Sequence, residues 1–434
     1  MKTLRLATLG VAATLALSAC SGSSAGTDAG DEPGSDPSAG GQAPAEMRLW
    51  LVGTDTPQEA RDHLEKEFET AHPETDLVIE EHVWEGLVDK LTTSLSGSDS
   101  PDVVEVGNTQ AVAFTSAGAF LDITDKKEEL GGDDLLEGFV ESGTYDDKFY
   151  AAPYYAGSRL VFYRKDLLAK SALEVPQTLE DYVAAGEKLR ADNGQGQFSG
   201  IYFPGQDWRN ALPYIWAAGG DLAVEDDGKW KGALSSPESV EGLTMVQDVI
   251  QNASGAAKDG NETDPQVLYC ADQIGMLSAP GWVKGSIVAP QDAGGCPEAE
   301  ENLGVFALPG QSAGETAPVF LGGSNIAVSA NSENPELAYE LLQMMLSDDY
   351  QTILAANGLI PARTSLISAM GTGEVVDATA AAASNTKLTP AAPGWANVES
   401  DKILEDLFVQ IAQGGDVQQL AEDAVEKITA ALNR

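Results

Sequence analysis

The pattern of apolar and polar positions switches between strand-like and helix-like periods along the chain, starting at residue 46. Residues 47–52 form a short, mostly apolar run, which predicts a strand. Ala60, Leu64 and Phe68 then recur at the spacing of one helix face, which predicts a helix over 57–71. Such alternation is typical of a parallel sheet with helices on its faces.

The same alternation continues to the end of the 434-residue chain, which is long enough for two or three domains. We expect further strands at 77–79, 103–106, 201–203, 305–308 and 326–329, and further helices at 87–95, 179–189, 240–250 and 335–346. Asp416 is a suitable N-cap for the last helix, with Gln419 three residues later. Polar, glycine-rich stretches at 131–134 and 192–196 predict surface turns.

Residues 1–19 have the features of a secretory signal. Lys2 and Arg5 precede an apolar run that is too short for the ~20 residues of a membrane-spanning helix. The segment 17–20, Leu-Ser-Ala-Cys, resembles a bacterial lipobox, which predicts cleavage before Cys20 and lipidation of its sulfur. The alternative is an ordinary secretory signal followed by an unmodified cysteine. Residues 20–45 contain no large apolar side chain and are expected to form a flexible tether.

Charge excludes several classes of partner. The chain has 25 basic and 68 acidic residues, a net charge of −43. Nucleic acid is therefore not expected as a ligand, because phosphate binding needs clustered Lys and Arg. Docking on anionic lipid through a basic face is disfavoured for the same reason. A net charge of this size favours a soluble monomer.

Signatures of catalysis are weak. Residues 22–26 match the spacing of a nucleophile elbow but lie in the tether, without the strand and helix that the elbow needs. His63, His72 and His82 lack the spacing of a metalloprotease helix. No phosphate-binding loop occurs, and neither a metal nor a cofactor is predicted. Composition does not exclude a glycosidase-type pair of carboxylates.

Two cysteines remain once Cys20 is assigned to the anchor. In an exported protein, Cys270 and Cys296 are expected to form a disulfide. The alternative is two reduced, partly buried thiols.

Aromatic residues next to polar or turn-rich stretches suggest a ligand site: Trp84, Tyr154, Tyr155, Trp208, Trp216, Trp282 and Trp395. Trp282 and Trp395 each follow a Pro-Gly pair, where the interior of a helix or strand is not expected. An aromatic ring suits the C–H face of a sugar, while amide, carboxylate and guanidinium groups bind its hydroxyls. Any one of these rings could instead belong to the core, and Trp216 fits the core best.

At these residues the chain resembles the extracellular solute-binding proteins of ABC transporters, in the carbohydrate-binding family that includes maltose-binding protein. The segments that carry the resemblance are 100–106, 151–155, 161–168, 216–220, 322–328 and 358–363. The resemblance extends over 46–434 and implies an α/β fold with two lobes and a ligand cleft between them. It implies an N-terminal lobe of 46–156 plus 316–363 and a C-terminal lobe of 157–315 plus 364–434.

The resemblance also implies a set of ligand contacts. Asp55 follows the first strand, and Asn108, Thr109 and Gln110 follow the third. The other candidates are Trp84, Tyr154, Tyr155, Trp208, Arg209, Trp282, Asn325 and Trp395. Where maltose-binding protein has an aromatic after the third strand, this chain has Gly107-Asn108. The segment 104–110 is more similar to actinobacterial proteins that bind disaccharides such as chitobiose.

The function implied is a non-catalytic receptor, anchored by lipid to the extracellular face of the membrane. It captures an oligosaccharide and delivers it to an ABC permease. Two other functions remain open at this point: a ferric-iron receptor that uses adjacent tyrosines such as Tyr154 and Tyr155, and a lipid-anchored glycoside hydrolase.

Overall fold

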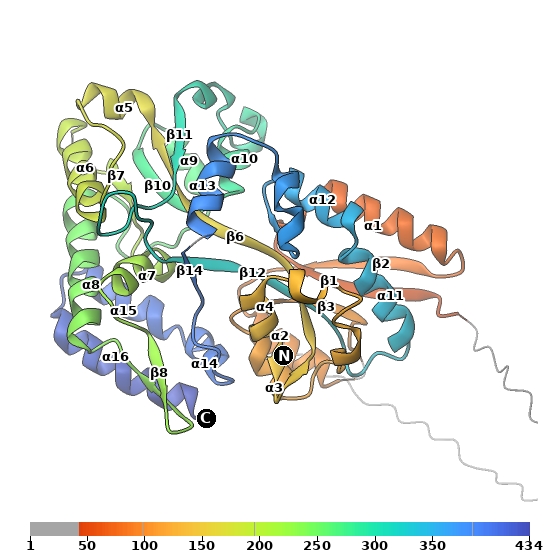
Figure 1. Cartoon of the computed structure of the whole chain (residues 1–434). Helices are drawn as coiled ribbons and strands as arrows, with labels where there is room; N and C mark the ends of the chain where they lie inside the picture. The colour runs from red at the N-terminus through yellow and green to blue at the C-terminus, as the bar shows by residue number, and fades with distance from the viewer. Residues whose placement is uncertain (1–42, 98, 195, 384) are drawn as a thin grey trace, which may run out of the picture. The chain divides into compact units, whose positions relative to one another are not determined.

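The computed structural model describes residues 43–97, 99–194, 196–383 and 385–434 (Figure 1). The expected signal segment, Cys20 and nearly all of the tether lie outside these residues. Residues 43–434 form one compact unit. Within the described residues, no helix combines the length and the apolar character needed to cross a membrane.

The first half of the sheet follows the predicted alternation. Strand β1 (Glu46–Val52) pairs in parallel with β2 (Asp76–His82) and β3 (Val103–Gly107). Helix α1 (Gln58–Ala71) buries Ala60, Leu64 and Phe68, and α2 (Leu87–Leu95) buries its leucines. These apolar side chains pack against the sheet, which is why the helical period of the sequence located both helices correctly.

Two long strands cross the middle of the sheet, and they make it mixed rather than parallel. Strand β6 (Ala151–Arg164) and β12 (Val319–Val328) pair antiparallel with each other, and β12 also pairs antiparallel with β3. The strand order is β2-β1-β3-β12-β6-β10-β7, ending in β10 (Ile274–Pro280) and β7 (Ser199–Tyr202). The expected parallel pairing therefore holds for β1, β2 and β3 but not for the two strands at the centre of the sheet.

Strands β6 and β12 join two hydrophobic cores. Ala152, Tyr154 and Tyr155 of β6 belong to the core around β1, α1 and α11 (Pro335–Met345). Further along the same strand, residues 160–162 belong to a second core around β7, β10 and the helices of the C-terminal region. Figure 1 shows β6 and β12 running between these two groups of elements. Trp282 packs against both cores.

The remaining elements cover these two cores or connect them. The helices are α3 (Ala111–Ser116), α4 (Glu137–Ser142), α5 (Lys165–Lys170), α6 (Leu179–Asp192), α7 (Trp208–Ala217), α8 (Pro237–Asp248), α9 (Pro265–Cys270), α10 (Val283–Ile287), α12 (Asp348–Ala356), α13 (Glu374–Ala383), α14 (Trp395–Ser400), α15 (Ile403–Ala412) and α16 (Val417–Leu432). The short strands are β4 (Thr144–Tyr145), β5 (Lys148–Phe149), β8 (Ala223–Asp226), β9 (Lys229–Gly232), β11 (Leu303–Phe306), β13 (Ile360–Pro361) and β14 (Thr386–Lys387).

Three local features can be compared with the sequence. The backbone N–H of Gln419 donates to Asp416 Oδ1 at 2.9 Å, so the predicted N-cap of α16 is confirmed. The turn expected at 131–134 contains a short 3₁₀ helix, Gly132–Asp134. Cys270, at the end of α9, forms a disulfide with Cys296, with a Cα–Cα distance of 5.6 Å.

Candidate functional site

The first group of candidate residues lies where β1, β2 and β3 end. These parallel neighbours bring the segments that follow them to one edge of the sheet. An ideal Cβ added at Gly53 would lie 2.8 Å from Trp84 Nε1, and one at Gly107 would lie 3.2 Å from the Trp84 ring. The indole of Trp84 therefore lies across the ends of β1 and β3, and its side chain is 40% exposed.

Asp55 is half-buried beside this indole. The Tyr155 hydroxyl lies 3.3 Å from Asp55 Oδ2, and the Trp84 N–H also faces the carboxylate. Burial raises the pKa of Asp55 above its usual value, while Tyr155, Trp84 and the charge of Arg61 act in the opposite direction. The site thus combines an exposed aromatic face with a carboxylate whose acceptor oxygens are held by polar neighbours.

The segment that follows β3 reaches towards helix α14. Gln110 Nε2 donates to Glu399 Oε2 at 3.0 Å, and Trp395 Nε1 donates to Glu399 Oε1 at 3.1 Å. Glu399 thereby links the segment that follows β3 to the start of α14. A long ion pair, 3.7 Å between Lys402 Nζ and Glu85 Oε1, connects the same two regions.

The second group of candidate residues lies at the start of α7. The Arg209 guanidinium lies 4.5 Å from the centre of the Trp208 ring, and Arg209 Nη1 lies 3.6 Å from Glu262. Glu262 also binds the buried Arg159 of β6. Burial works against ionisation of Glu262, yet Arg159 and Arg209 hold its pKa below the usual range.

Arg159 has a second acidic neighbour in Asp207, which is the N-cap of α7. Arg159 Nη2 lies 3.5 Å from Asp207 Oδ1, and Asp207 accepts the backbone N–H of Asn210 at 3.2 Å. Burial raises the pKa of Asp207, although Arg159 opposes that effect. This network fixes the first turn of α7 and, through Glu262, the direction of Arg209.

Trp282 is half-buried and lies against β6. A Cβ added at Gly157 would lie 2.1 Å from its ring, so no larger residue fits at this position of the strand. Because the ring also contacts both cores, Trp282 is placed where groups from the two regions meet.

Four expected ligand contacts are core residues, and those expectations are corrected here. Trp395 is 0% exposed and Trp208 is 1% exposed, so neither ring presents a free face for a sugar. The hydroxyl of Tyr154, also fully buried, bonds Thr56 at 2.9 Å and Tyr350 at 2.6 Å. Asn325 is buried, and its side-chain amide donates hydrogen bonds to the carbonyl oxygens of Phe139 and Ala151.

Two further candidates position other groups rather than face solvent. Tyr155 is 1% exposed and donates to Glu105 at 2.9 Å. Asn108 is largely buried and donates to the Leu321 carbonyl oxygen at 3.1 Å. Thr109 and Gln110, in the same segment as Asn108, remain candidates together with Asp55, Trp84, Arg209 and Trp282.

The tyrosine pair does not fit iron. Burial raises the pKa values of Tyr154 and Tyr155 well above the usual range, so the phenolates that iron would need are strongly disfavoured. Within the part of the chain that the structure describes, no group of three or more His, Cys, Asp or Glu residues is placed to hold a metal.

Sequence reasoning missed Glu105, Glu399, Glu262 and Arg159. Glu105 had a detectable signal, since it is a charged residue inside the otherwise apolar strand Val103–Gly107, in which every position is buried. Glu399 lies one helical turn after Trp395, but nothing in the sequence indicated its bond to Gln110. Glu262 lies in a polar loop that no pattern related to β6.

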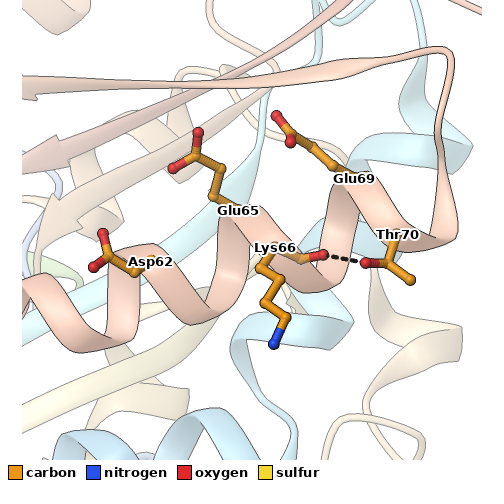
Figure 2. Close-up of a pocket in the computed structure, with 5 residues that line it drawn as sticks. All are labelled: Asp62, Glu65, Lys66, Glu69 and Thr70. Atoms are coloured by element: carbon orange, nitrogen blue, oxygen red, sulfur yellow. Dashed lines mark hydrogen bonds between the residues drawn. The ribbon is translucent and has the colours of Figure 1, made fainter.

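A surface hollow of about 370 Å³ lies along α1 (Figure 2). It is lined by Asp62, Glu65, Lys66, Glu69 and Thr70. Figure 2 shows Glu65 and Glu69 on one side of the helix and Lys66 on the other. Since one helix supplies all the lining groups and they do not converge, this hollow is a surface feature and not the ligand site.

Comparison with known proteins finds similar sequences and structures among bacterial solute-binding proteins. Residues 53–352 match the family model described as bacterial extracellular solute-binding protein. The chain is 34% identical over 410 residues to the diacetylchitobiose-binding protein DasA of Streptomyces coelicolor, covering 92% of each protein. Alignment with the GacH receptor of Streptomyces glaucescens gives a TM-score of 0.76 at 22% identity, covering 90% of this chain and 99% of that one.

The sugar-binding protein MalE of Xanthomonas citri gives a TM-score of 0.75 at 19% identity, covering 89% of this chain and 97% of that one. These structural likenesses confirm the expected α/β fold with two lobes. Together with the match of the family model over most of the sequence, they show that the chain belongs to the bacterial extracellular solute-binding protein family, whose members are receptors and not enzymes.

Proposed function

We propose that the protein is a receptor that captures an oligosaccharide between its two lobes and delivers it to an ABC permease. The observation that carries the proposal is the exposed indole of Trp84, which lies across the ends of β1 and β3 next to Asp55. A flat apolar face beside hydrogen-bonding groups suits a sugar, which has both C–H and hydroxyl surfaces. Trp282, which lies against β6, and Arg209 of α7 would add further contacts.

The proposed ligand is a short oligosaccharide such as chitobiose. The relative at 34% identity is named for diacetylchitobiose, and it aligns over nearly the whole chain. The hydroxyl of Thr109 and the amide of Gln110 follow β3, where a sugar's hydroxyl and acetamido groups would find both donors and acceptors.

The lobes are proposed to comprise 46–156 with 316–363, and 157–315 with 364–434. On β6 the membership of the two hydrophobic cores supports this division, because the strand changes core between Tyr155 and Leu160. On β12, Val319 and Phe320 still belong to the second core, so there the change falls after 316. The two crossing strands, β6 and β12, would then form the hinge. A ligand that contacts both lobes would favour the closed form.

The receptor is proposed to be a monomer held at the outer face of the membrane by lipid on Cys20. The lipobox-like segment 17–20 and the tether that follows support this anchor. Replacing Cys20 with Ala should release the protein from the membrane fraction or leave it unprocessed. Retention of a processed form in that fraction would contradict the anchor.

Calorimetric titration and thermal unfolding of the purified protein test which sugar it binds. We expect N,N′-diacetylchitobiose to bind and to raise the melting temperature, because a ligand that binds only the native state stabilises it. Maltose and cellobiose serve as comparison sugars. If no oligosaccharide in a broad panel changes the melting temperature, the proposed function is wrong.

Two tryptophan variants separate the site from the core. Trp84→Ala should weaken binding about thirty-fold or more, as truncation of a contact aromatic does, with little change in stability. Trp395→Ala should lower the free energy of unfolding by about 3–5 kcal/mol, because its ring is fully buried. Full affinity in Trp84→Ala would show that Trp84 does not contact the sugar.

A further inference from the structure

Glu105 is a carboxylate inside the sheet. It lies in the middle of β3 and is completely buried. Its Oε2 accepts the Val52 backbone N–H at 2.8 Å, and its Oε1 accepts the hydroxyls of Ser324 at 2.6 Å and Tyr155 at 2.9 Å. All three donors are uncharged. A buried carboxylate held in this way is costly to ionise. Its presence in a core strand therefore indicates a role other than packing.

The two hydroxyl donors come from the two strands that cross between the cores. Ser324 of β12 and Tyr155 of β6 are direct partners in the ladder, and the register shifts immediately after Ser324. At the preceding position, Gly323 has a φ of 145°, and an added Cβ would lie 2.3 Å from the Tyr155 carbonyl oxygen. Glu105 therefore ties both crossing strands to the end of β1, at the irregular point of the ladder.

The hydroxyl of Tyr155 has one proton and two carboxylates within reach. It lies 2.9 Å from Glu105 Oε1 and 3.3 Å from Asp55 Oδ2. Only one of these acceptors can take the proton in a well-formed hydrogen bond. The shorter distance assigns it to Glu105, which leaves the Asp55 Oδ2 lone pair that faces Tyr155 available to another donor.

We propose that Glu105 is a positioning residue that controls, through the hydroxyl proton of Tyr155, whether the Oδ2 position of Asp55 that faces Tyr155 is free to accept a hydrogen bond from a ligand hydroxyl. Ionised Glu105 accepts the hydrogen bond from Tyr155, and the Oδ2 position of Asp55 that faces Tyr155 is free. When Glu105 binds one proton from solvent, it donates to the Tyr155 oxygen, and Tyr155 turns its own proton to Asp55. This inference rests on the proposed function, in which Asp55 contacts the sugar.

Both forms of Glu105 are populated near neutral pH. Burial raises the pKa of Glu105 to about 7, although its three hydrogen bonds oppose the rise. The titratable groups that face it in the described part of the chain are Asp55 after β1, Tyr154 and Tyr155 of β6, and Tyr350 of α12. Arg61 of α1 acts on Asp55 and Tyr350. Of the groups that face Glu105, the tyrosines have raised pKa values and stay protonated.

The test is the affinity for N,N′-diacetylchitobiose, measured by calorimetry from about pH 5.5 to about pH 8.5. The wild-type affinity should fall about tenfold as the pH is lowered, the loss expected for one hydrogen bond to a charged acceptor. Glu105→Gln imitates the protonated form, so it should bind more weakly than wild type at the upper pH and show no pH dependence.

Tyr155→Phe is the complementary variant, since it removes the shared proton. It should also lack pH dependence, but it should bind more tightly than wild type at the lower pH. Equal affinities and pH profiles in wild type and Glu105→Gln would overturn the proposal. If Glu105→Gln does not fold, Tyr155→Phe is compared with wild type instead, and equal affinities and pH profiles in these two proteins would overturn the proposal.

A readout without ligand distinguishes this proposal from the proposed function. The Trp84 indole faces Asp55, so its fluorescence, taken as the difference between wild type and Trp84→Phe, reports on Asp55. We expect a transition near pH 7 in the wild type and none in Glu105→Gln or Tyr155→Phe. If that pattern is seen but the sugar does not bind at any pH, the ligand assignment fails and the coupling stands. If all variants give the same titration, the coupling fails.

Discussion

The two regions that supply candidate ligand contacts each contain a desolvated carboxylate, fully buried at Glu105 and partly exposed at Glu262, and the two are held in opposite ways. In the first region Glu105 is bound by a backbone N–H and two hydroxyls. In the second, Glu262 lies between the guanidinium groups of Arg159 and Arg209. Burial raises the pKa of Glu105 to about 7, while the two arginines bring the pKa of Glu262 below its usual range. Burial opposes the charge of both carboxylates, and only at Glu262 do the two arginines outweigh it.

The comparison also shows what each arrangement can do. The second network is a fixed support: Arg159 is shared by Asp207 and Glu262, and it holds the start of α7 and the loop that carries Glu262. The first network can change state near neutral pH because its charge has no cationic partner among the residues that bind it. The region around β3 is thus suited to respond to protonation, whereas the ion pairs of Arg159 hold the region around α7 together.

The largest effect is expected from removing the shared cation. Arg159→Met leaves Asp207 and Glu262 without their common partner, so the free energy of unfolding should fall by about 3–5 kcal/mol, as when one partner of a buried ion pair is lost. Urea unfolding at neutral pH measures this. Arg209→Met is the matched control, because Arg209 is partly exposed and its loss should cost much less. Equal losses in both variants would contradict the central role of Arg159.

Removing the charge of Glu105 should raise the free energy of unfolding, whereas removing Arg159 lowers it. The pKa of Glu105 in the folded state, about 7, is above its ordinary value of 4.5. The stability that this group contributes is therefore complete below about pH 4.5 and is lost as the pH rises through about 7. Glu105→Gln avoids that loss, so at about pH 8 it should be more stable than wild type, by up to about 3 kcal/mol.

The measurement is the difference in unfolding free energy between Glu105→Gln and wild type across this pH range. The difference should grow with pH and level off above about pH 8. A variant less stable than wild type throughout would mean that Glu105 serves only to hold the sheet together.

The strands and helices that could be predicted are those with one buried face. Leu64 and Phe68 of α1 were placed correctly because a half-buried helix carries its period in the sequence. Strand β6 could not be found in this way, since twelve of its fourteen residues are buried and no alternation remains. Tyr154 and Tyr155 were therefore expected near a turn, although they lie inside a long strand.

The site was harder to predict because local sequence does not determine burial. Pro280-Gly281-Trp282 and Pro393-Gly394-Trp395 are the same tripeptide, and both were expected to present a ring to the ligand. Trp282 is half-buried between the two cores, whereas Trp395 is fully buried at the start of α14. A Cβ at Gly394 would lie 2.4 Å from the Leu432 carbonyl oxygen, so α16 closes over that segment. Only the packing of distant elements separates the two cases.

A smaller effect is expected from removing one of the uncharged hydrogen-bond donors to Glu105. Ser324→Ala removes one donor from Glu105 and should raise the pH midpoint of its titration, with a stability loss of about 1 kcal/mol. Ser142→Ala is the matched control, because this buried hydroxyl bonds Asn325 and not Glu105. The control should lose similar stability and keep the wild-type midpoint. The same midpoint in both variants would show that Ser324 does not set the charge of Glu105.

The smallest effect concerns the contact that joins the two regions. Gln110→Ala removes the 3.0 Å bond to Glu399, leaving that carboxylate with its bond from Trp395. We expect this partly buried hydrogen bond to contribute about 1 kcal/mol, so the ratio of closed to open forms should fall about fivefold. Small-angle scattering without ligand should then give a larger radius of gyration than for wild type. Lys402→Ala breaks only the exposed pair with Glu85 and should leave the radius unchanged, since such pairs contribute little. If Lys402→Ala expands the protein as much as Gln110→Ala does, the bond to Glu399 is not what favours closure.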